Sequence, residues 1–259
     1  MYMLNVLPIR AFTDNYIWLI QTNEGNTLVD PGDSDPVKEV INDLNIEIDD
    51  ILITHHHFDH TGGLNDLKKS IKGKVIGPHN KNIPQIDLRV KEGDAINSVG
   101  LNFKVINVPG HTLDHIAFFC KESVEPILFC GDTVFSGGCG RVFEGTFSQM
   151  HESLNKIASL PKNTLIYCAH EYTLSNLNFA MEVEPLNYDI KNYYESCSKK
   201  LSSNVPTIPT TLKKELSINP FLRSSTYELR ESISNDFSNV NDVPDHKVFE
   251  YVRKWKDSL

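Results

Sequence analysis

Short apolar runs alternate with turn signals over the first two-thirds of the chain. The runs are short and end at glycine, proline or asparagine, which is typical of strands. Two segments between them, 36–44 and 61–70, have helical periodicity. This alternation predicts an α/β fold. The predicted strands span residues 16–20, 27–30, 51–54, 74–77 and 103–106.

The pattern changes near residue 171, where strand signals end and longer amphipathic segments begin. Proline-rich stretches separate these segments, as expected of helices joined by loops. We therefore expect two domains, residues 1–170 and a helical domain of residues 171–259. The predicted helices of the second domain span residues 174–183, 188–201, 211–216, 227–232 and 245–256.

Polar residues that can bind metals follow four of the apolar runs. His55, His111, Asp132 and His170 each come after such a run. One edge of a sheet could gather all four, held by rigid strands yet open to solvent. An isolated histidine in such a place is more often structural, but no packing argument favours so many polar groups together.

The run 54–60, Thr-His-His-His-Phe-Asp-His, adds further candidates. In extended backbone His55 and His57 point to one side and His56 to the other, while Asp59 and His60 can face a second ion. The full set exceeds the three protein ligands of a catalytic zinc, so two divalent ions are expected. If Asp132 bridges them and a hydroxide is shared, each ion is five-coordinate. Zinc is the expected metal, with iron and manganese as alternatives.

Composition limits the possible functions. With 40% hydrophobic and 23% charged residues and no long apolar stretch, the chain has no predicted membrane segment, and it shows no secretory signal. Five scattered cysteines without a C-x-x-C pair suit reduced thiols. We expect a cytoplasmic protein. The net charge of −9 disfavours nucleic-acid binding and requires a local basic patch for any anionic substrate.

The metal-binding pattern resembles that of the metallo-β-lactamase superfamily. The resemblance covers the first domain and implies a four-layer αβ/βα sandwich. It places His55, His57 and His111 on one metal, and a second group on the other, with a carboxylate between the two ions. Active β-lactamases usually carry cysteine at that bridging position, which argues against lactamase activity. The second group is Asp59, His60 and His170, and the bridge is Asp132.

Further motifs over the full length resemble glyoxalase II, the hydroxyacylglutathione hydrolases. The resemblance implies hydrolysis of S-D-lactoylglutathione to D-lactate and glutathione by a metal-bridging hydroxide, the second step of methylglyoxal detoxification. Asp59 and Asp132 would be catalytic. We expect a monomer with a small-molecule substrate. The motifs lie at residues 12–16, 29–33, 110–112, 138–146, 168–173 and 219–223.

The same resemblance implies a binding site for the two carboxylates of glutathione. Arg253 and Lys256 share one helix face; they match binders of the glycine carboxylate, although cations near a helix C-terminus are often merely solvated. Arg141 and Tyr172 would line the same groove. Phe143 stands where some relatives carry tyrosine.

Some alternatives remain open. A glutathione persulfide dioxygenase with a single iron is the main rival activity, while a lactonase, a nuclease and a non-enzymatic binding protein fit less well. Asp14 and Asp30 could orient ligating histidines or only form turns. His115 is expected beside the site rather than as a ligand. Asp114 stands where relatives commonly carry glycine. No function is expected of His56, His79, His151 and His246.

Overall fold

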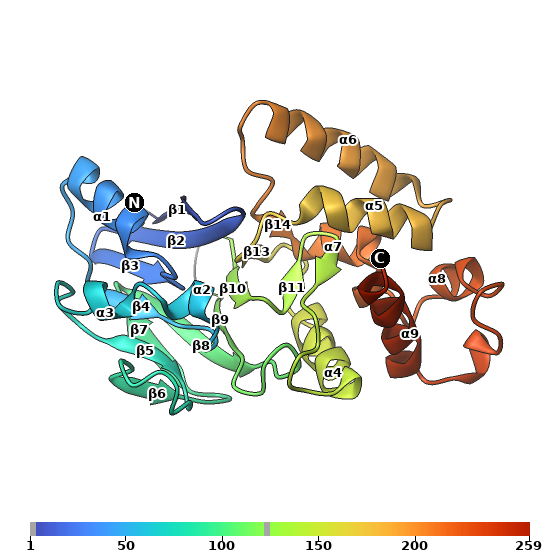
Figure 1. The fold of residues 1–259 in the computed structure, drawn as a ribbon, viewed down its shortest axis with the longest axis horizontal. Helices are drawn as coiled ribbons and strands as arrows, with labels where there is room; N and C mark the ends of the chain where they lie inside the picture. The colour runs from blue at the N-terminus through green and yellow to red at the C-terminus, as the bar shows by residue number, and fades with distance from the viewer. Residues whose placement is uncertain (1–3, 122–124) are drawn as a thin grey trace. The chain divides into compact units, whose positions relative to one another are not determined.

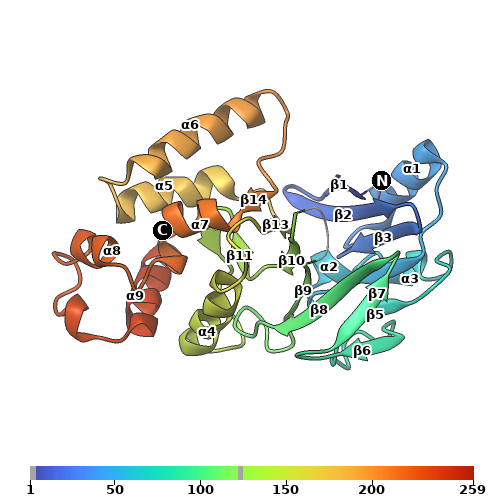
Figure 2. The same cartoon turned by 180° about the vertical axis from the view of Figure 1, so that it is seen from behind.

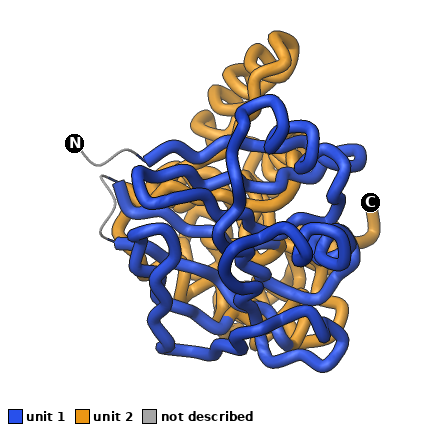
Figure 3. The backbone as a smooth tube through the Cα atoms, turned by 90° about the vertical axis from the view of Figure 1, so that its left-hand side faces the viewer, with its two compact units in different colours: residues 1–107, 114–131 blue, residues 108–113, 132–259 orange. Residues whose placement is uncertain are grey.

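The computed structural model of the chain describes residues 4–121 and 125–259 (Figure 1). Residues 1–3, part of the N-terminal run in which no secretory signal was expected, lie outside the described residues. The chain divides into two compact units (Figure 3). Unit 1 comprises residues 1–107 and 114–131, and unit 2 comprises residues 108–113 and 132–259.

Unit 1 contains a six-stranded sheet in sequence order. The first three strands are antiparallel, and the remaining pairings are parallel. Helix α1 (Ser34–Leu44) forms the crossover between β3 and β4, and Asp33 caps its first turn. The strands are β1 (Leu4–Ala11), β2 (Asn15–Thr22), β3 (Gly25–Val29), β4 (Asp50–Leu52), β5 (Val75–Pro78) and β6 (Leu88–Val90).

Four more strands of unit 1 form an antiparallel series, in which each strand pairs with the next (Figure 2). Phe103, Phe118 and Phe129 come from three of these strands and pack edge to face. Apolar side chains of β2, β3 and β4 pack with those of α1 in a second core. The four strands are β7 (Ala95–Ser98), β8 (Leu101–Asn107), β9 (Ile116–Cys120) and β10 (Ile127–Gly131).

Unit 2 is mainly helical and contains two pairs of short strands. Strand β11 (Val134–Phe135) pairs with β12 (Gly138–Cys139), and β13 (Leu165–Cys168) pairs with β14 (Thr210–Thr211). Apolar residues of α5, α6 and α7 form a compact core. The helices are α4 (Phe147–Ala158), α5 (Thr173–Val183), α6 (Tyr188–Ser202), α7 (Leu212–Ile218), α8 (Tyr227–Ser232) and α9 (Asp245–Asp257), with 3-10 turns η1 (Pro220–Leu222) and η2 (Val240–Asp242).

The structure confirms the α/β class and the series of C-terminal helices, but two expectations were wrong. The helix expected at 61–70 is two short helices, α2 (Phe58–Thr61) and α3 (Leu64–Leu67). They are separated at Gly62 and Gly63, where a Cβ would lie 2.5 and 2.6 Å from backbone oxygens. Strand signals also do not end at residue 171, because β14 follows. Among the described residues no helix is both long and apolar enough to cross a membrane.

Candidate metal centre and substrate-binding residues

The metal-binding loop, residues 55–60, follows β4 and leads into α2. His55 and His60 are fully buried, and His57 is partly exposed. His55 Nε2 lies 3.2 Å from His57 Nδ1, and His60 Nε2 lies 3.5 Å from Asp59 Oδ2. The loop therefore places imidazole and carboxylate groups together within unit 1.

Asp30 organises this loop from the end of β3. One of its carboxylate oxygens accepts from the Thr54 amide at 2.8 Å, and the other lies 2.7 Å from the Thr54 hydroxyl and 3.0 Å from His60 Nδ1. A carboxylate at Nδ1 fixes the tautomer in which Nε2 can bind a metal. Close by, a Cβ on Gly32 would lie 1.8 Å from the Asp59 carbonyl oxygen, so only glycine fits there.

Asn15 holds the neighbouring carboxylate. Its Nδ2 donates to Asp59 Oδ2 at 2.9 Å, and Asn15 is buried at the start of β2. The sequence does not indicate this contact, although Asn15 belongs to the motif at residues 12–16. A role for Asp14 in orienting a ligand stays a prediction.

Unit 2 contains three more candidates, which are a carboxylate and the two imidazoles beside it. Asp132 Oδ2 lies 3.4 Å from His111 Nε2, and Asp132 Oδ1 lies 3.4 Å from His170 Nε2. His111 Nδ1 donates to the backbone carbonyl of Arg141 at 2.8 Å, which leaves Nε2 to face Asp132. The carboxylate thus presents one oxygen to each imidazole.

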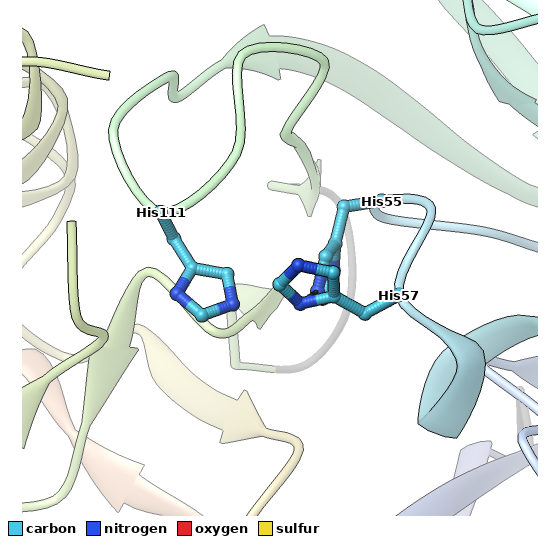
Figure 4. Close-up of side chains that lie close together, drawn as sticks. All are labelled: His55, His57 and His111. Carbon is cyan, nitrogen blue, oxygen red and sulfur yellow. Dashed lines mark hydrogen bonds between the residues drawn. The ribbon is translucent and has the colours of Figure 1, made fainter. Parts of the chain in front are cut away.

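The seven predicted ligands occur in three groups whose ligand atoms lie within 4.8 Å of one another. Figure 4 shows the first group with its imidazole rings turned toward a common space. Imidazole with carboxylate is a donor set suited to zinc, iron or manganese, so the residues present fit a divalent metal. The groups are His55, His57 and His111; His55, His60 and Asp132; and Asp59, His60 and His170.

The residues expected to bind substrate all lie in unit 2. Phe143 is 62% exposed, and its ring lies 5.2 Å from that of His111. Tyr172 is 37% exposed and stacks on His170, with ring centroids 4.7 Å apart. Arg141 is exposed, and its Nε lies 3.4 Å from Asp257 Oδ1. Two of these side chains therefore contact imidazoles of the candidate ligands.

Arg253 differs from the others because it is only 2% exposed. Its guanidinium donates to the Cys139 carbonyl and to Asp257 Oδ1, both at 2.9 Å, and lies over the Phe221 ring. These contacts link α9 to β12, which comes just before Arg141. Arg253 thus stabilises the packing of α9 in unit 2 in addition to carrying positive charge.

Lys256 lies one turn further along α9 and donates from Nζ to Asn176 Oδ1. Burial lowers the pKa of its ammonium group to about 8, and the neighbouring positive charges of Arg253 and Arg141 act in the same direction. A cation held in this way is only partly solvated, so an incoming carboxylate would compensate an unfavourable local field.

Four histidines were expected to have no function. Among them, His151 is buried, with Nε2 3.1 Å from the Ser224 hydroxyl, and burial lowers its pKa. This contact is structural. His115 stacks on His55, as expected of a residue beside the site, and His56 faces Asp114.

Family models match the whole chain apart from its first residues. The metallo-β-lactamase superfamily model matches residues 11–170, and the model for the hydroxyacylglutathione hydrolase C-terminus matches residues 171–259. The ETHE1 crystal structure from Myxococcus xanthus, at 23% identity and a TM-score of 0.63, covers 97% of this chain and 96% of its own. The class is therefore a metallo-β-lactamase fold, a four-layer αβ/βα sandwich followed by a helical region.

Curated relatives narrow the class. The hydroxyacylglutathione hydrolase of Pseudomonas paraeruginosa is 45% identical over 260 residues, which cover 99% of this chain and 100% of the relative. A crystal structure of TTHA1623 in a di-iron-bound form is 27% identical, has a TM-score of 0.55, and covers 63% of this chain and 91% of its own. The chain belongs to the hydroxyacylglutathione hydrolase family, also called glyoxalase II.

Proposed function

We propose that this protein hydrolyses S-D-lactoylglutathione and related 2-hydroxyacyl-glutathiones to the hydroxy acid and glutathione, the second step of methylglyoxal detoxification. The observation that carries the proposal is the convergence of seven imidazole and carboxylate side chains in groups of three, in a chain similar to curated hydroxyacylglutathione hydrolases over its full length.

We propose two divalent cations at this site, with zinc expected and iron or manganese as alternatives. His55, His57 and His111 would hold one cation, and Asp59, His60 and His170 would hold the other. Asp132 would be shared by both cations. When bound, such cations provide a hydroxide at neutral pH and polarise the thioester carbonyl. The similar TTHA1623 structure holds two irons. Metal analysis of the purified protein would therefore distinguish zinc from iron and manganese.

The chain's own residues prepare this site before substrate arrives. Asp30 and the Arg141 carbonyl hold the Nδ1 atoms of His60 and His111, so each presents Nε2 as a ligand atom. The Thr54 hydroxyl donates to Asp30 and lies 3.1 Å from His55 Nδ1. Its oxygen can therefore accept a hydrogen bond from the Nδ1–H of His55. These contacts remove rotational freedom from three imidazoles.

Asp59 would orient the attacking hydroxide. Its Oδ2 accepts a hydrogen bond from Asn15, which fixes the direction of the other carboxylate oxygen. The reaction needs no serine or cysteine nucleophile, and glutathione leaves as a thiolate that requires little acid assistance. Stabilisation of charge on the carbonyl oxygen is the largest expected contribution to rate.

Cationic side chains of unit 2 would bind the carboxylates of glutathione. Lys256 and Arg141 present local positive charge in a chain whose net charge is −9, and Arg253 supports them through Cys139 and Asp257. Tyr172 and Phe143 would line the groove beside His170 and His111. Phe143 offers no hydroxyl, so it would contribute apolar contact alone.

The test follows loss of the thioester absorbance of S-D-lactoylglutathione on protein of known metal content, with other thioesters in parallel. We expect hydrolysis that scales with bound metal. Oxygen consumption with glutathione persulfide, together with no thioester hydrolysis, would instead support the single-iron dioxygenase. Metal-loaded protein that catalyses neither reaction would contradict the proposal.

Three further expectations from the sequence remain predictions. We propose domains of residues 1–170, which carry the catalytic fold, and 171–259, which bind glutathione. A cytoplasmic location is to be checked by cell fractionation. A monomer is to be checked by light scattering on an eluting gel-filtration peak.

A further inference from the structure

Two consecutive residues, Asp114 and His115, contact two consecutive residues of the metal-binding loop within unit 1. Asp114 Oδ1 lies 2.9 Å from His56 Nδ1, and the His115 ring stacks on that of His55, with centroids 4.4 Å apart and planes inclined by 15°. The two residues just before β9 therefore each contact one residue of the loop.

The Asp114 carboxylate is itself held in place. Its second oxygen accepts from Asn80 Nδ2 at 2.7 Å, and the Asn80 carbonyl accepts from Arg89 Nη1 at 2.6 Å. Only 8% of the Asp114 side chain and 18% of the His56 side chain is exposed. Because both carboxylate oxygens are engaged and little water reaches them, Asp114 is a fixed point for His56.

His56 is the residue between His55 and His57, so a fixed His56 ring restrains the backbone on both sides. The backbone has no helix or strand from residue 53 to residue 57, a stretch that includes the first three residues of the loop. Other restraints act at its two ends, where Asp30 accepts from the Thr54 amide and the Thr61 hydroxyl donates to the His57 carbonyl at 2.9 Å. The contact of His56 with Asp114 acts at its centre.

We propose that Asp114 is a positioning residue for the metal centre, acting through His56 to hold His55 and His57 in their ligating arrangement. The inference rests on the proposed function, because it takes these two histidines as ligands. Metal-binding geometry must be held within about 0.5 Å to be effective. Loss of the Asp114–His56 contact should therefore loosen metal binding before it disturbs the fold.

The test measures the rate at which zinc-loaded protein releases zinc to a chromophoric chelator. The variants are Asp114→Ala, His56→Ala and the double variant. Residues that orient a ligand typically change metal affinity about 10- to 100-fold; because Asp114 acts through a neighbour of the ligands, we expect release about 3- to 10-fold faster in each single variant. The double variant should be no faster than either, because one contact has been removed in all three.

Two further variants complete the design. Asp114→Asn keeps an acceptor for His56 and should restore most of the slow release. Asp236→Ala removes a carboxylate from an exposed turn of unit 2 and should release zinc like wild type, which controls for the change in net charge. If Asp114→Ala does not fold, Asn80→Ala removes the support of the carboxylate, together with an acceptor for the Asn82 amide, and should still accelerate release.

The inference would be overturned if folded Asp114→Ala released zinc at the wild-type rate. It would also be overturned if the rate increases of the two single variants multiplied in the double variant. Zinc release needs no thioester substrate, so wild-type protein that binds zinc without hydrolysing S-D-lactoylglutathione would contradict only the proposed function. Wild-type protein that holds no zinc would overturn both.

Discussion

Asp132 has one carboxylate oxygen 3.4 Å from an imidazole nitrogen of His111 and the other 3.4 Å from one of His170. We propose that a side chain in this position serves both ligand sets. We expect Asp132→Ala to lose at least half of the bound metal and about 1000-fold or more in kcat, since Lewis-acid catalysis requires both sites to be filled. Elemental analysis of purified protein and thioester hydrolysis measure the two effects.

Asp236→Ala is the matched control, and circular dichroism establishes that both variants are folded. If Asp132→Ala kept its metal and its turnover, Asp132 could not be the shared ligand.

The proposed role of Lys256 in binding predicts that substrate binding depends on pH. Because its pKa is lowered to about 8, the ammonium form that attracts a carboxylate is present below this pH and is lost above it. We expect kcat/KM for S-D-lactoylglutathione to fall as pH rises through about 8, chiefly through a higher KM. Steady-state kinetics from about pH 6.5 to about 9.5 measure this.

Lys256→Arg stays charged over this range, so its profile should lose the fall near pH 8. Lys256→Ala should raise KM below about pH 8, where the wild-type side chain is charged, and change kcat little. A lower kcat with unchanged KM would contradict the assignment of Lys256 to binding.

The sequence indicated the candidate ligands that the structure groups together, because core packing rarely favours imidazoles and carboxylates directly after so many apolar runs. It could not indicate what holds them. The Arg141 carbonyl that orients His111 is a backbone group, which every residue type possesses. Asn15 is an amide next to a turn, where asparagine is common for local reasons, and only the folded backbone brings it to Asp59.

At the level of the elements, buried Glu215 of α7 holds the turn between β11 and β12. It accepts from the Gly137 amide at 2.8 Å and from the Thr210 hydroxyl at 2.7 Å, and Asn219 and Ser136 also donate to it. Glu215→Ala would leave these buried donors without their acceptor. We expect a loss of about 3 kcal/mol in the free energy of unfolding, measured by urea denaturation.

Glu215→Gln fills the same volume and keeps one acceptor, so its loss should be smaller. Equal stability of Glu215→Ala and wild type would show that water replaces the carboxylate.

Periodicity identified α1 and the helices after residue 171, but it did not identify α4 (Phe147–Ala158). It failed at 61–70, where Gly62 and Gly63 approach the backbone of Pro31 and Gly32. Close approach between segments distant in sequence leaves no periodic signal. Strand β14 was missed for a related reason, since two residues cannot show alternation.

At the scale of the whole molecule, bound metal should stabilise the fold. A ligand that binds only the folded chain adds RT ln(1 + [L]/Kd), which is about 4 kcal/mol at a free concentration about 1000 times Kd. We expect a chelator to lower the Tm by roughly 5 °C or more, from the size dependence of unfolding entropy. Differential scanning calorimetry, with zinc added back as the control, measures this; an unchanged Tm would mean that metal binding is weak.

The proposed domain boundary at residue 171 differs from the division of the chain into two compact units. The first follows the kind of element, and the second follows the packing of the elements. Composition changes near residue 171, where the model for the hydroxyacylglutathione hydrolase C-terminus begins. Contacts assign residues 132–170 to the same unit as the C-terminal helices, partly because Phe147 of α4 packs with Phe249 of α9. A sequence shows where the kind of element changes, but it does not show which elements share a core.

The bond from Arg253 to the Cys139 carbonyl joins residues 114 positions apart, and this separation sets an order of events during folding. Contacts between distant residues form late, and α9 is also synthesised after α1 to α8. The proposed glutathione-binding residues should therefore reach their final arrangement after much of unit 2 has folded. In a Trp18→Phe variant, Trp255 of α9 is the remaining tryptophan; during refolding its fluorescence change should coincide with the recovery of substrate affinity.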